Sequence, residues 1–438
     1  MVKVLASKTG LAFGLAALCS VFAPTTLHAQ DDSTIGYRMA AGDTLIGVSQ
    51  EYVIGRDAAA RLARLNRIQN PRRIPIGTVI RIPRDQLVYR PAGLAVLSSR
   101  GPVTIDGVEA SQGAELREGA VVQTGPGGFV SFQTVDGAAI SLPSNTLARL
   151  ERSRIYLLRD LRDVHFRILS GRGEVIAPTL RDDERWQTST PVSVTAVRGT
   201  VYRVGYSEEA ELGLTEVVEG SVAVTADEAA TVAQEGFGVV VVDEGLSPPE
   251  ALLPPPEIEN ANAIQTGEAV AFEIALPEGA VALRTQLATD AGFLELFAED
   301  ISSEGAAFTD LPNGRYFIRS RGISANGLEG LSAPVAENFR RKRLGSEASV
   351  EASPIEDGYR FAWLPQGEGT THFAFQLWRE GESDAPLYDE IALPGSATVV
   401  TGLEPGTYVW RVAAIQADEE DGLLKIWGSE QRLAVSAE

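Results

Sequence analysis

The chain of 438 residues is too long for a single hydrophobic core, so its length predicts three or four domains. With 44% hydrophobic and 22% charged residues, its composition is that of a globular protein and argues against general disorder. The net charge of −21 repels the phosphates of nucleic acids and of anionic membranes, so neither is an expected partner. Few aromatic residues, 43 glycines and 23 prolines favour many short strands separated by turns.

Residues 1–29 are predicted to form a secretory signal peptide. Two lysines precede a mainly apolar run at 11–22, and small residues then lead to Ala29, where we expect cleavage. This run is shorter than the ~20 residues of a membrane-spanning helix, and no later stretch approaches that length. Lipidation of Cys19 is disfavoured because Leu18 precedes it, where a small residue is expected. We therefore expect an exported mature chain without a transmembrane segment and without cysteine.

The next segment, residues 37–83, differs in character from the rest. It is part of a stretch with ten arginines against six acids, whereas the remainder of the chain is strongly acidic. Asp43 is expected to cap the first of two short helices, and Leu62 and Leu65 to share one face of the second. The expected elements are a strand at 37–39, a helix at 44–52, a helix at 58–65 and a strand at 79–83.

Three stretches of this segment together resemble the LysM domain. They are Tyr37–Leu45, then Leu62-x-x-Leu65-Asn66-x-Ile68-x-Asn70-Pro71, then Ile74-x-x-Gly77-Thr78-x-Ile80-x-Ile82-Pro83. The resemblance implies a small βααβ module, at 37–84, that binds peptidoglycan or a chitin-like glycan containing N-acetylglucosamine in a shallow groove. It places this groove between two loops, which are Gly42, Asp43, Thr44 and Leu45 on one side and Ile68, Gln69, Asn70 and Pro71 on the other.

Recognition of a sugar requires hydrogen-bonding groups for its hydroxyl and acetamido groups and an apolar patch for its faces. Leu45 and Ile68 are expected to form the patch, while Thr44 and Gln69 supply polar contacts. A purely structural role stays open for Gly42, Asp43, Asn66 and Asn70. Turns and helix caps require the same residue types.

Residues 92–246 show an all-β pattern, with turn signals every eight to fifteen residues. Only 147–161 has partly helical character. The strand candidates are 103–105, 129–132, 139–142, 192–204, 217–218, 222–224 and 239–242. Their spacing indicates a stacked or solenoid-like sheet.

This region resembles the FecR domain, chiefly at Thr190–Val204 and also at 140–146, 169–175 and 217–224. The best-known members are inner-membrane regulators that pass a transport signal to a sigma factor. No cytoplasmic segment or transmembrane helix is expected before this domain, so the anti-sigma role is not expected to apply. What the resemblance implies is an extracytoplasmic β domain used for protein contact.

A proline-rich linker is expected at 247–257, followed by two small β-sandwich modules at 258–343 and 347–438. The hexapeptide Leu311–Tyr316 recurs 92 residues later as Leu403–Tyr408, a spacing that fits tandem modules. The modules resemble fibronectin type III domains. The hexapeptide resembles the corner in which a tyrosine hydroxyl bonds to upstream backbone.

Few other residues suggest chemistry. The mature chain has only His165 and His372 and no cysteine, so neither a catalytic thiol nor a His/Cys metal site is expected. Arg198, beside a glycine, is interpreted as structural. The acidic run at 418–422 is interpreted as a hairpin tip, and the basic run at 340–343 as a linker or a charged edge strand.

The sequence therefore predicts a mainly β, multidomain, non-catalytic protein of the periplasm, associated with the cell wall and without a cofactor or metal. It would anchor to glycan through the LysM-like module and present its other modules to an envelope protein. Two alternatives stay open. One is an accessory component of envelope signalling that docks on a membrane sensor through the FecR-like domain. The other is a wall hydrolase, for which no region of suitable length remains.

Overall fold

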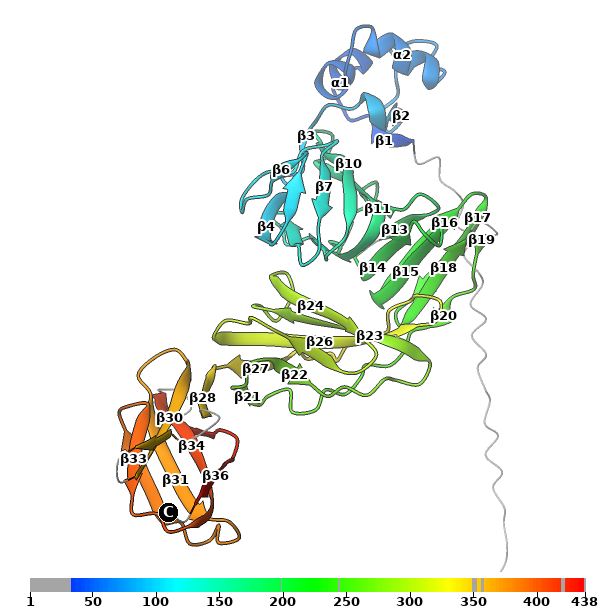
Figure 1. Cartoon of the computed structure of the whole chain (residues 1–438). Helices are drawn as coiled ribbons and strands as arrows, with labels where there is room; N and C mark the ends of the chain where they lie inside the picture. Colours follow the sequence, from blue (N-terminus) through cyan, green and yellow to red (C-terminus); the bar gives the residue numbers. More distant parts are fainter. Residues whose placement is uncertain are drawn as a thin grey trace, which may run out of the picture. The chain divides into compact units, whose positions relative to one another are not determined.

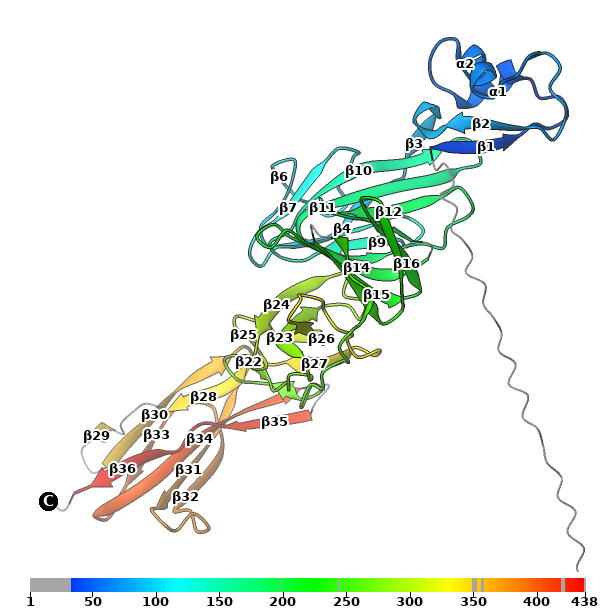
Figure 2. The ribbon, with the colours of Figure 1, turned by 90° about the vertical axis from the view of Figure 1, so that its right-hand side faces the viewer.

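The computed structural model describes residues 33–197, 199–242, 245–348, 353–355, 358–418 and 422–436 (Figures 1 and 2). The chain divides into two compact units, one ending at Val88 and the other beginning at Tyr89. The predicted signal peptide and Arg198 lie outside the described residues, as does most of the acidic run at 418–422. No helix in the described ranges is long and apolar enough to cross a membrane.

The first unit has the predicted βααβ order. Its elements are β1 (Thr34–Arg38), α1 (Leu45–Tyr52), α2 (Ala58–Leu65) and β2 (Val79–Pro83), followed by a short 3₁₀ turn (Arg84–Gln86). The two strands pair antiparallel, and their inward side chains, Ile35 and Ile82 among them, form the core with Leu62. The prediction that Leu65 shares this face is wrong, because α2 ends there and the side chain is exposed.

Asn66 fastens the end of α2 to β2. Its side-chain amide donates to the carbonyl oxygens of Leu62 and Arg81, each at 2.9 Å, and its carbonyl accepts the Arg81 amide at 2.7 Å. One side chain thereby satisfies a helix-terminal carbonyl and both backbone groups of a strand residue. The structural alternative considered for Asn66 is thus its observed role.

The second unit begins with two sheets that share one long strand, β11 (Leu161–Ile176). One sheet contains β4 (Ala95–Arg100), β8 (Phe129–Gln133), β9 (Ala139–Leu142), β14 (Val201–Ser207), β15 (Leu212–Glu219), β18 (Phe237–Val242), β19 (Gly245–Leu246) and β20 (Glu250–Ala251). The other contains β3 (Tyr89–Pro91), β5 (Val103–Ile105), β6 (Val108–Glu109), β7 (Val121–Thr124), β10 (Leu147–Tyr156), β12 (Arg185–Ser189), β13 (Val194–Val197), β16 (Ser221–Ala226) and β17 (Ala229–Gln234).

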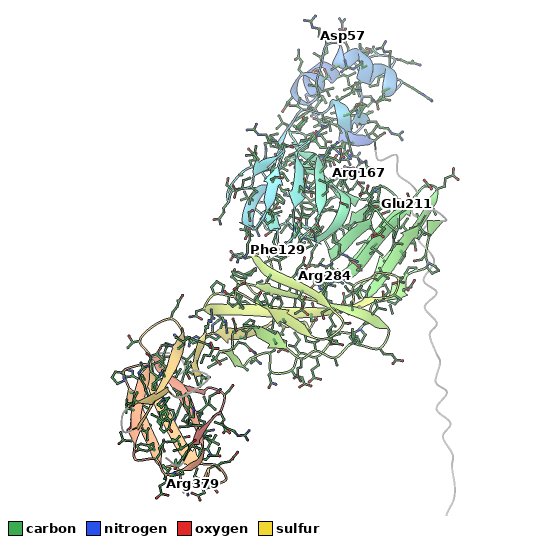
Figure 3. All side chains as sticks on the ribbon, viewed as in Figure 1. Asp57, Phe129, Arg167, Glu211, Arg284 and Arg379 are labelled. Carbon is green, nitrogen blue, oxygen red and sulfur yellow. The ribbon has the colours of Figure 1, made fainter. Side chains whose placement is uncertain are left out.

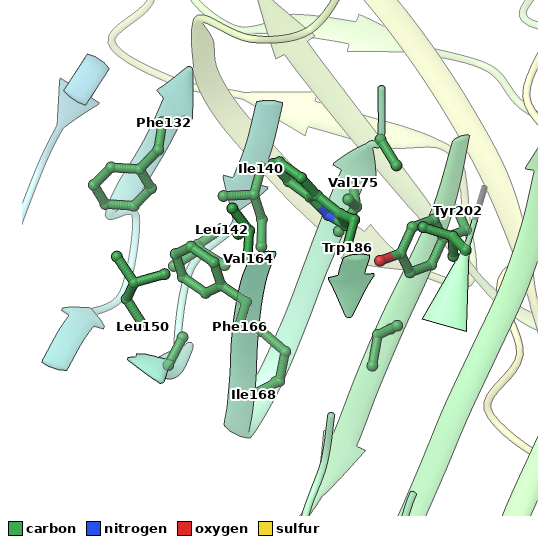
Figure 4. Packing of buried hydrophobic residues seen from close by; sticks show 14 of the residues in the cluster. Phe132, Ile140, Leu142, Leu150, Val164, Phe166, Ile168, Val175, Trp186 and Tyr202 are labelled. Atoms are coloured by element: carbon green, nitrogen blue, oxygen red, sulfur yellow. The ribbon is translucent and has the colours of Figure 1, made fainter. Parts of the chain in front are cut away.

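Strand β11 passes from one sheet to the other at Gly171. This glycine has φ +83°, and a Cβ there would lie 2.6 Å from the carbonyl oxygen of Asn145, so no larger residue fits. The first part of β11 pairs with β10 and β12, and the last part with β9 and β14. Between the sheets lies one apolar core that includes Phe132, Phe166 and Trp186 (Figure 4).

Two details of this region differ from the sequence-based predictions. Residues 147–156 form strand β10 and not a partial helix, because the stretch follows the alternating burial of a strand at its start. The expected continuous strand at 192–204 is interrupted by a turn at Gly199, which has φ +78°. For β10, the alternation of buried and exposed side chains was the signal that indicated a strand.

Two sandwich modules follow. The first pairs the sheet β21 (Ile264–Gln265), β27 (Glu337–Arg341), β26 (Gly314–Ser324), β23 (Ala280–Ala288) and β24 (Leu296–Ser302) with β22 (Val270–Phe272) and β25 (Ala306–Phe308). The second contains β28 (Leu344–Ala348), β29 (Ser353–Ile355), β30 (Gly358–Gly367), β31 (His372–Arg379), β32 (Tyr388–Leu393), β33 (Ala397–Thr401), β34 (Gly406–Asp418), β35 (Gly422–Trp427) and β36 (Gln431–Val435).

The predicted tyrosine corners are present in both modules. The Tyr316 hydroxyl donates to the carbonyl of Pro312 at 3.1 Å, and the Tyr408 hydroxyl to that of Glu404 at 2.8 Å. Each bond ties the start of a long strand to the preceding turn. The repeated hexapeptide is therefore a structural device.

The basic run at 340–343 is not an exposed edge. Strand β27 lies between β21 and β26, and the Arg341 guanidinium is buried and donates to backbone carbonyls, including that of Leu311. Arg340 forms two 2.7 Å bonds to the carboxylate of Asp418 in the second sandwich. The run thus joins the two sandwich modules by a bidentate ion pair.

A buried carboxylate joins the first sandwich to the large sheets. Glu329 is 1% exposed, and its oxygens lie 2.7 Å from Arg284, 3.2 Å from Arg172 and 3.2 Å from Arg321. Its backbone amide donates to Glu216 at 3.0 Å. Arg172 and Glu216 belong to the large sheets, whereas Arg284 and Arg321 belong to the sandwich. Glu329 therefore bonds to both modules at once.

A second carboxylate, Glu174 on β11, extends this network into the sandwich. It receives two bonds from Arg319, at 2.7 and 3.0 Å, and lies 3.4 Å from Arg321. Phe129 of the large sheets, labelled in Figure 3, also belongs to one buried apolar cluster with Phe293 and Leu296 of the sandwich. Burial by itself would raise the pKa of each carboxyl, but the arginines outweigh it and lower the pKa of Glu174 to about 2 and that of Glu329 well below its ordinary range.

The stretch predicted as a proline-rich linker, residues 247–257, contacts both modules. Strand β20 pairs with β18, and Leu252 packs beside the cluster of Leu214, Val240 and Leu328. That cluster again combines both modules. The large sheets and the first sandwich therefore form one packed body.

Replacing Asn66 by Ala is expected to lower the free energy of unfolding of the first unit by about 2 kcal/mol, because the strand groups at Arg81 lose their partner. Hydrogen exchange at the amides of Ile80 and Ile82 measures this. Asn70→Ala is the matched control, since its side chain makes one exposed bond to the Arg72 amide. Equal protection in both variants would contradict the proposed role.

Glu329→Gln is expected to destabilise the second unit by about 3–5 kcal/mol, because it removes the carboxylate that three buried arginines share and leaves an excess of positive charge in the buried network. Urea unfolding followed by circular dichroism measures the change. Glu304→Gln, on an exposed position of the same module, should leave the midpoint unchanged. A loss no larger for Glu329→Gln than for this control would show that the network contributes little.

The same carboxylates predict sensitivity to acid. Their folded pKa values lie below the ordinary value of 4.5, so their contribution is complete above pH 4.5 and is lost as the pH falls toward 2. The urea midpoint of the second unit should decline over that window. The double variant Glu174→Gln/Glu329→Gln should decline less steeply, and parallel curves would refute the assignment.

Candidate functional site

The first expected loop, residues 42–45, is held by Asp43 in a way that the sequence did not predict. The Asp43 carboxylate accepts the Ala40 amide at 2.6 Å and the Tyr37 hydroxyl at 2.8 Å. The cap of α1 is instead Thr44, whose hydroxyl accepts the Gly47 amide at 3.0 Å. The predicted capping role of Asp43 is therefore wrong, and Asp43 fixes the turn before the cap.

This contact also contributes to a raised pKa of the Tyr37 phenol. Burial, followed by the hydrogen bond to the Asp43 carboxylate, raises the pKa of the Tyr37 phenol to about 12. The phenol therefore stays protonated and continues to donate to Asp43. This bond ties the loop to β1.

The apolar residue that this loop exposes is not the predicted one. Leu45 is fully buried and packs in the core, so its side chain cannot contribute to a surface patch. Its neighbour Ile46 is 57% exposed. In α1 the buried positions are Leu45, Val48 and Ser49, a spacing that turns Ile46 outward. The exposed apolar residue is therefore Ile46 and not Leu45, and the helical period of the buried positions could have indicated this from the sequence.

The second loop, residues 68–71, begins at a well-defined helix end. Arg67 has φ +51°, its amide donates to Arg64, and the Ile68 amide donates to the Ala63 carbonyl at 2.8 Å. This is a Schellman arrangement with an arginine at the position where glycine is usual. Ile68 is half-buried by it, whereas the three residues that follow, Gln69, Asn70 and Pro71, are exposed.

Backbone bonds hold the base of the first loop beside the start of β2. The Met39 amide donates to Thr78 at 2.9 Å, and the Gly77 amide donates to Met39 at 2.8 Å. Gly42 and Gly77 have φ values of +91° and +87°, so both turns need glycine. Gly42 thus has a structural role, while the exposed Ile76 lies on the segment that leads from the second loop to this junction.

The second loop is flanked by positive charge. Arg64 and Arg67 precede it, and Arg72 and Arg73 follow it, all with exposed side chains. Within the described residues none of these four guanidinium groups has a hydrogen bond or an ion pair. They are available to an anionic ligand. Sequence reasoning noted the positive charge of the segment but not its concentration around this loop.

The geometry of the two loops suits the binding of a ligand. The exposed groups are amides, backbone and guanidinium donors, and isolated apolar side chains, which together suit polar ligands with apolar faces. Among the residues that the structure describes, no cluster of three or more His, Cys, Asp or Glu side chains could hold a metal ion.

Two regions of the chain match models of known protein families. Residues 37–83 match the family model of the LysM domain, and residues 120–223 match that of the FecR protein. The comparison with curated protein sequences gave no match. LysM domains are associated with glycan binding and FecR proteins with envelope signalling, and both families are generally non-catalytic.

Three solved structures are similar to parts of the chain. A candidate anti-sigma factor from Parabacteroides distasonis is 18% identical, with a TM-score of 0.25, over 30% of this chain and 59% of its own length. The fibronectin(III)-like modules of Clostridium thermocellum CbhA are 11% identical over 41% of this chain and 94% of theirs, with a TM-score of 0.20. The chicken CNTN1 FN1–FN3 domains are 11% identical over 61% and 99%, with a TM-score of 0.22. The chain carries a LysM domain at residues 37–83 and a FecR domain at residues 120–223, and its structural neighbours include fibronectin type III-like modules.

Proposed function

We propose that this protein is an exported, non-catalytic peptidoglycan-binding protein of the periplasm. Its LysM domain holds glycan that contains N-acetylglucosamine, and its FecR domain and sandwich modules present a surface to an envelope protein. The observation that carries the proposal is the LysM match on a folded βααβ module whose second loop is exposed. The signal-like N-terminus, outside the described residues, supports export.

The exposed side chains suggest how the glycan is held. Ile46 supplies the apolar contact for a sugar face or an acetyl methyl, in place of Leu45. Gln69 supplies amide hydrogen bonds, and the backbone around Thr44 and Pro71 supplies others. Asn70 is partly committed, since its side chain accepts the Arg72 amide at 3.1 Å.

The arginines favour peptidoglycan over an uncharged chitin-like glycan. Peptidoglycan carries free carboxylates on its stem peptides, and a guanidinium pairs with a carboxylate through two parallel hydrogen bonds. Arg72 and Arg73 are exposed directly after the second loop, where carboxylates near a bound sugar would lie. Neutral chitin oligomers offer them no counter-charge.

A second candidate function is an accessory role in envelope signalling, with the FecR domain docked on a membrane sensor. The family match at residues 120–223 favours it. Crosslinking in cells separates the two candidates. A dominant adduct with one membrane receptor that persists after deletion of residues 37–83 would favour signalling.

The double variant Ile46→Asp/Gln69→Ala is expected to reduce retention on insoluble peptidoglycan at least about tenfold, because it removes the apolar contact and an amide donor. Sedimentation of the purified protein with sacculi measures retention. Both residues are exposed, so the fold should persist, and circular dichroism checks this.

The matched control is Ile54→Asp. Ile54 is 48% exposed but follows the opposite end of α1, which is about 12 Å long, so retention should not change. Equal retention of the double variant and this control would refute the assignment of the two loops. Failure of the unmodified protein to sediment with sacculi would refute glycan binding itself.

A further inference from the structure

A large cleft opens between the large sheets and the first sandwich. It has a volume of about 1140 Å³. Residues of β14, β15 and β18 line one wall, and residues of β24 and the end of β26 line the other. Figure 1 shows where these strands lie. The cleft is therefore composite, because neither module contains it alone.

The walls of the cleft are fixed relative to each other by the network around Glu329. Arg172 and Arg284 line the cleft, and each is bonded to that carboxylate, at 3.2 and 2.7 Å. Behind the apolar wall, Leu214 and Val240 pack against Leu328 of the sandwich. Contacts of this kind keep the cleft open in a single shape and reduce the entropic cost of binding there.

The charge that the cleft offers to a ligand is negative. Glu208, Glu209 and Asp300 line it, and within the described residues none of the three has an ion pair. The two arginines that line it are neutralised, because Arg172 also bonds to Glu216 and Arg284 to Glu299, each at 2.8 Å. An approaching cation would therefore meet uncompensated carboxylates.

Apolar and aromatic groups accompany the carboxylates. Leu212 and Val242 continue the Leu214 cluster into the cleft, and Ile301 on the facing wall is 52% exposed. Tyr206 lines the cleft with a half-buried ring, and in the part of the chain that is described its hydroxyl has no partner. A tyrosine beside carboxylates suits a lysine or arginine side chain, whose stem is apolar and whose head is charged.

The backbone at the cleft suits an extended segment. Strand β24 pairs with β23 on one side, and in the described structure no strand pairs with its other edge. Arg100 covers the first part of that edge through a 3.0 Å bond to the Phe297 carbonyl. In the last part of the strand, Asp300 and Ile301 line the cleft. Free edges of this kind bind extended peptides through main-chain hydrogen bonds.

We propose that this cleft binds an extended segment of a protein partner that carries lysine or arginine side chains together with apolar ones. The acidic rim pairs with the cations, the leucine and valine wall accepts the apolar side chains, and the free part of β24 offers main-chain bonds. The inference rests on the proposed role of this unit in partner binding, and it is independent of the glycan site.

The experiment uses the purified full chain and fluorescein-labelled octapeptides, with binding followed by fluorescence anisotropy at low and high salt. The cationic probe is acetyl-KLKSKLKS-amide, the acidic probe is acetyl-ELESELES-amide, and the uncharged probe is acetyl-SLSSSLSS-amide. The cationic probe is expected to bind saturably, at least about tenfold more tightly than either of the others, and more weakly at high salt.

Two variants test the walls separately. Glu208→Lys/Glu209→Lys should weaken binding of the cationic probe at least about tenfold, by reversing charge on an exposed loop. Its matched control is Glu211→Lys, on the same loop but outside the cleft lining. Ile301→Asp should also weaken binding by loss of the apolar contact, and Val281→Asp, at a similarly exposed position (57%) on β23, should not.

The outcomes separate the two proposals. Equal binding of the acidic and cationic probes, or unchanged binding in both wall variants, overturns the assignment of the cleft while leaving sedimentation with peptidoglycan intact. Tight binding of the uncharged probe alone would make the cleft an apolar site and would equally overturn it. Loss of sedimentation with retained peptide binding would refute only the glycan site.

Discussion

The second unit depends on one buried carboxylate. Glu329 lies among three arginines contributed by two modules, and its own backbone receives further bonds, since Arg203 donates to the carbonyls of Glu329 and Gly330 at 2.8 and 2.7 Å. A buried charge is costly to desolvate, so such an arrangement is stable only when its partners are in place together. The network therefore specifies one docking geometry, whereas apolar contacts alone would tolerate several.

The two units carry net charges of opposite sign. The LysM unit is net positive and exposes guanidinium groups beside its second loop, while the remainder of the chain is strongly acidic. A glycan bearing carboxylates is attracted to the first and repelled by the second. Conversely, a cationic protein segment is attracted to the second unit. One polypeptide can thus hold two unlike ligands without competition between them.

Local pattern predicted local structure well. The βααβ order, strand 79–83 and the two tyrosine corners were all foreseeable, because hydrophobic period and turn chemistry act over a few residues. The prediction for α1 was wrong by one residue, because the exposed apolar side chain is Ile46 and not Leu45. The pairing of Glu329 with Arg172 was not foreseeable, because it joins residues 157 positions apart and no local periodicity records which charges are buried together.

The attachment of residues 250–253 has a consequence for the history of the chain. A Cβ at Gly330 would lie 2.6 Å from the Leu253 carbonyl oxygen, and the Leu331 amide donates to that oxygen at 2.9 Å, so the connecting segment lies directly against the first sandwich. Recombination that exchanged this sandwich for another would separate arginines from their carboxylates and uncover a strand of the neighbouring sheet. We therefore expect residues 89–343 to be exchangeable between proteins only as one block, whereas the LysM domain belongs to a separate compact unit and could be exchanged by itself.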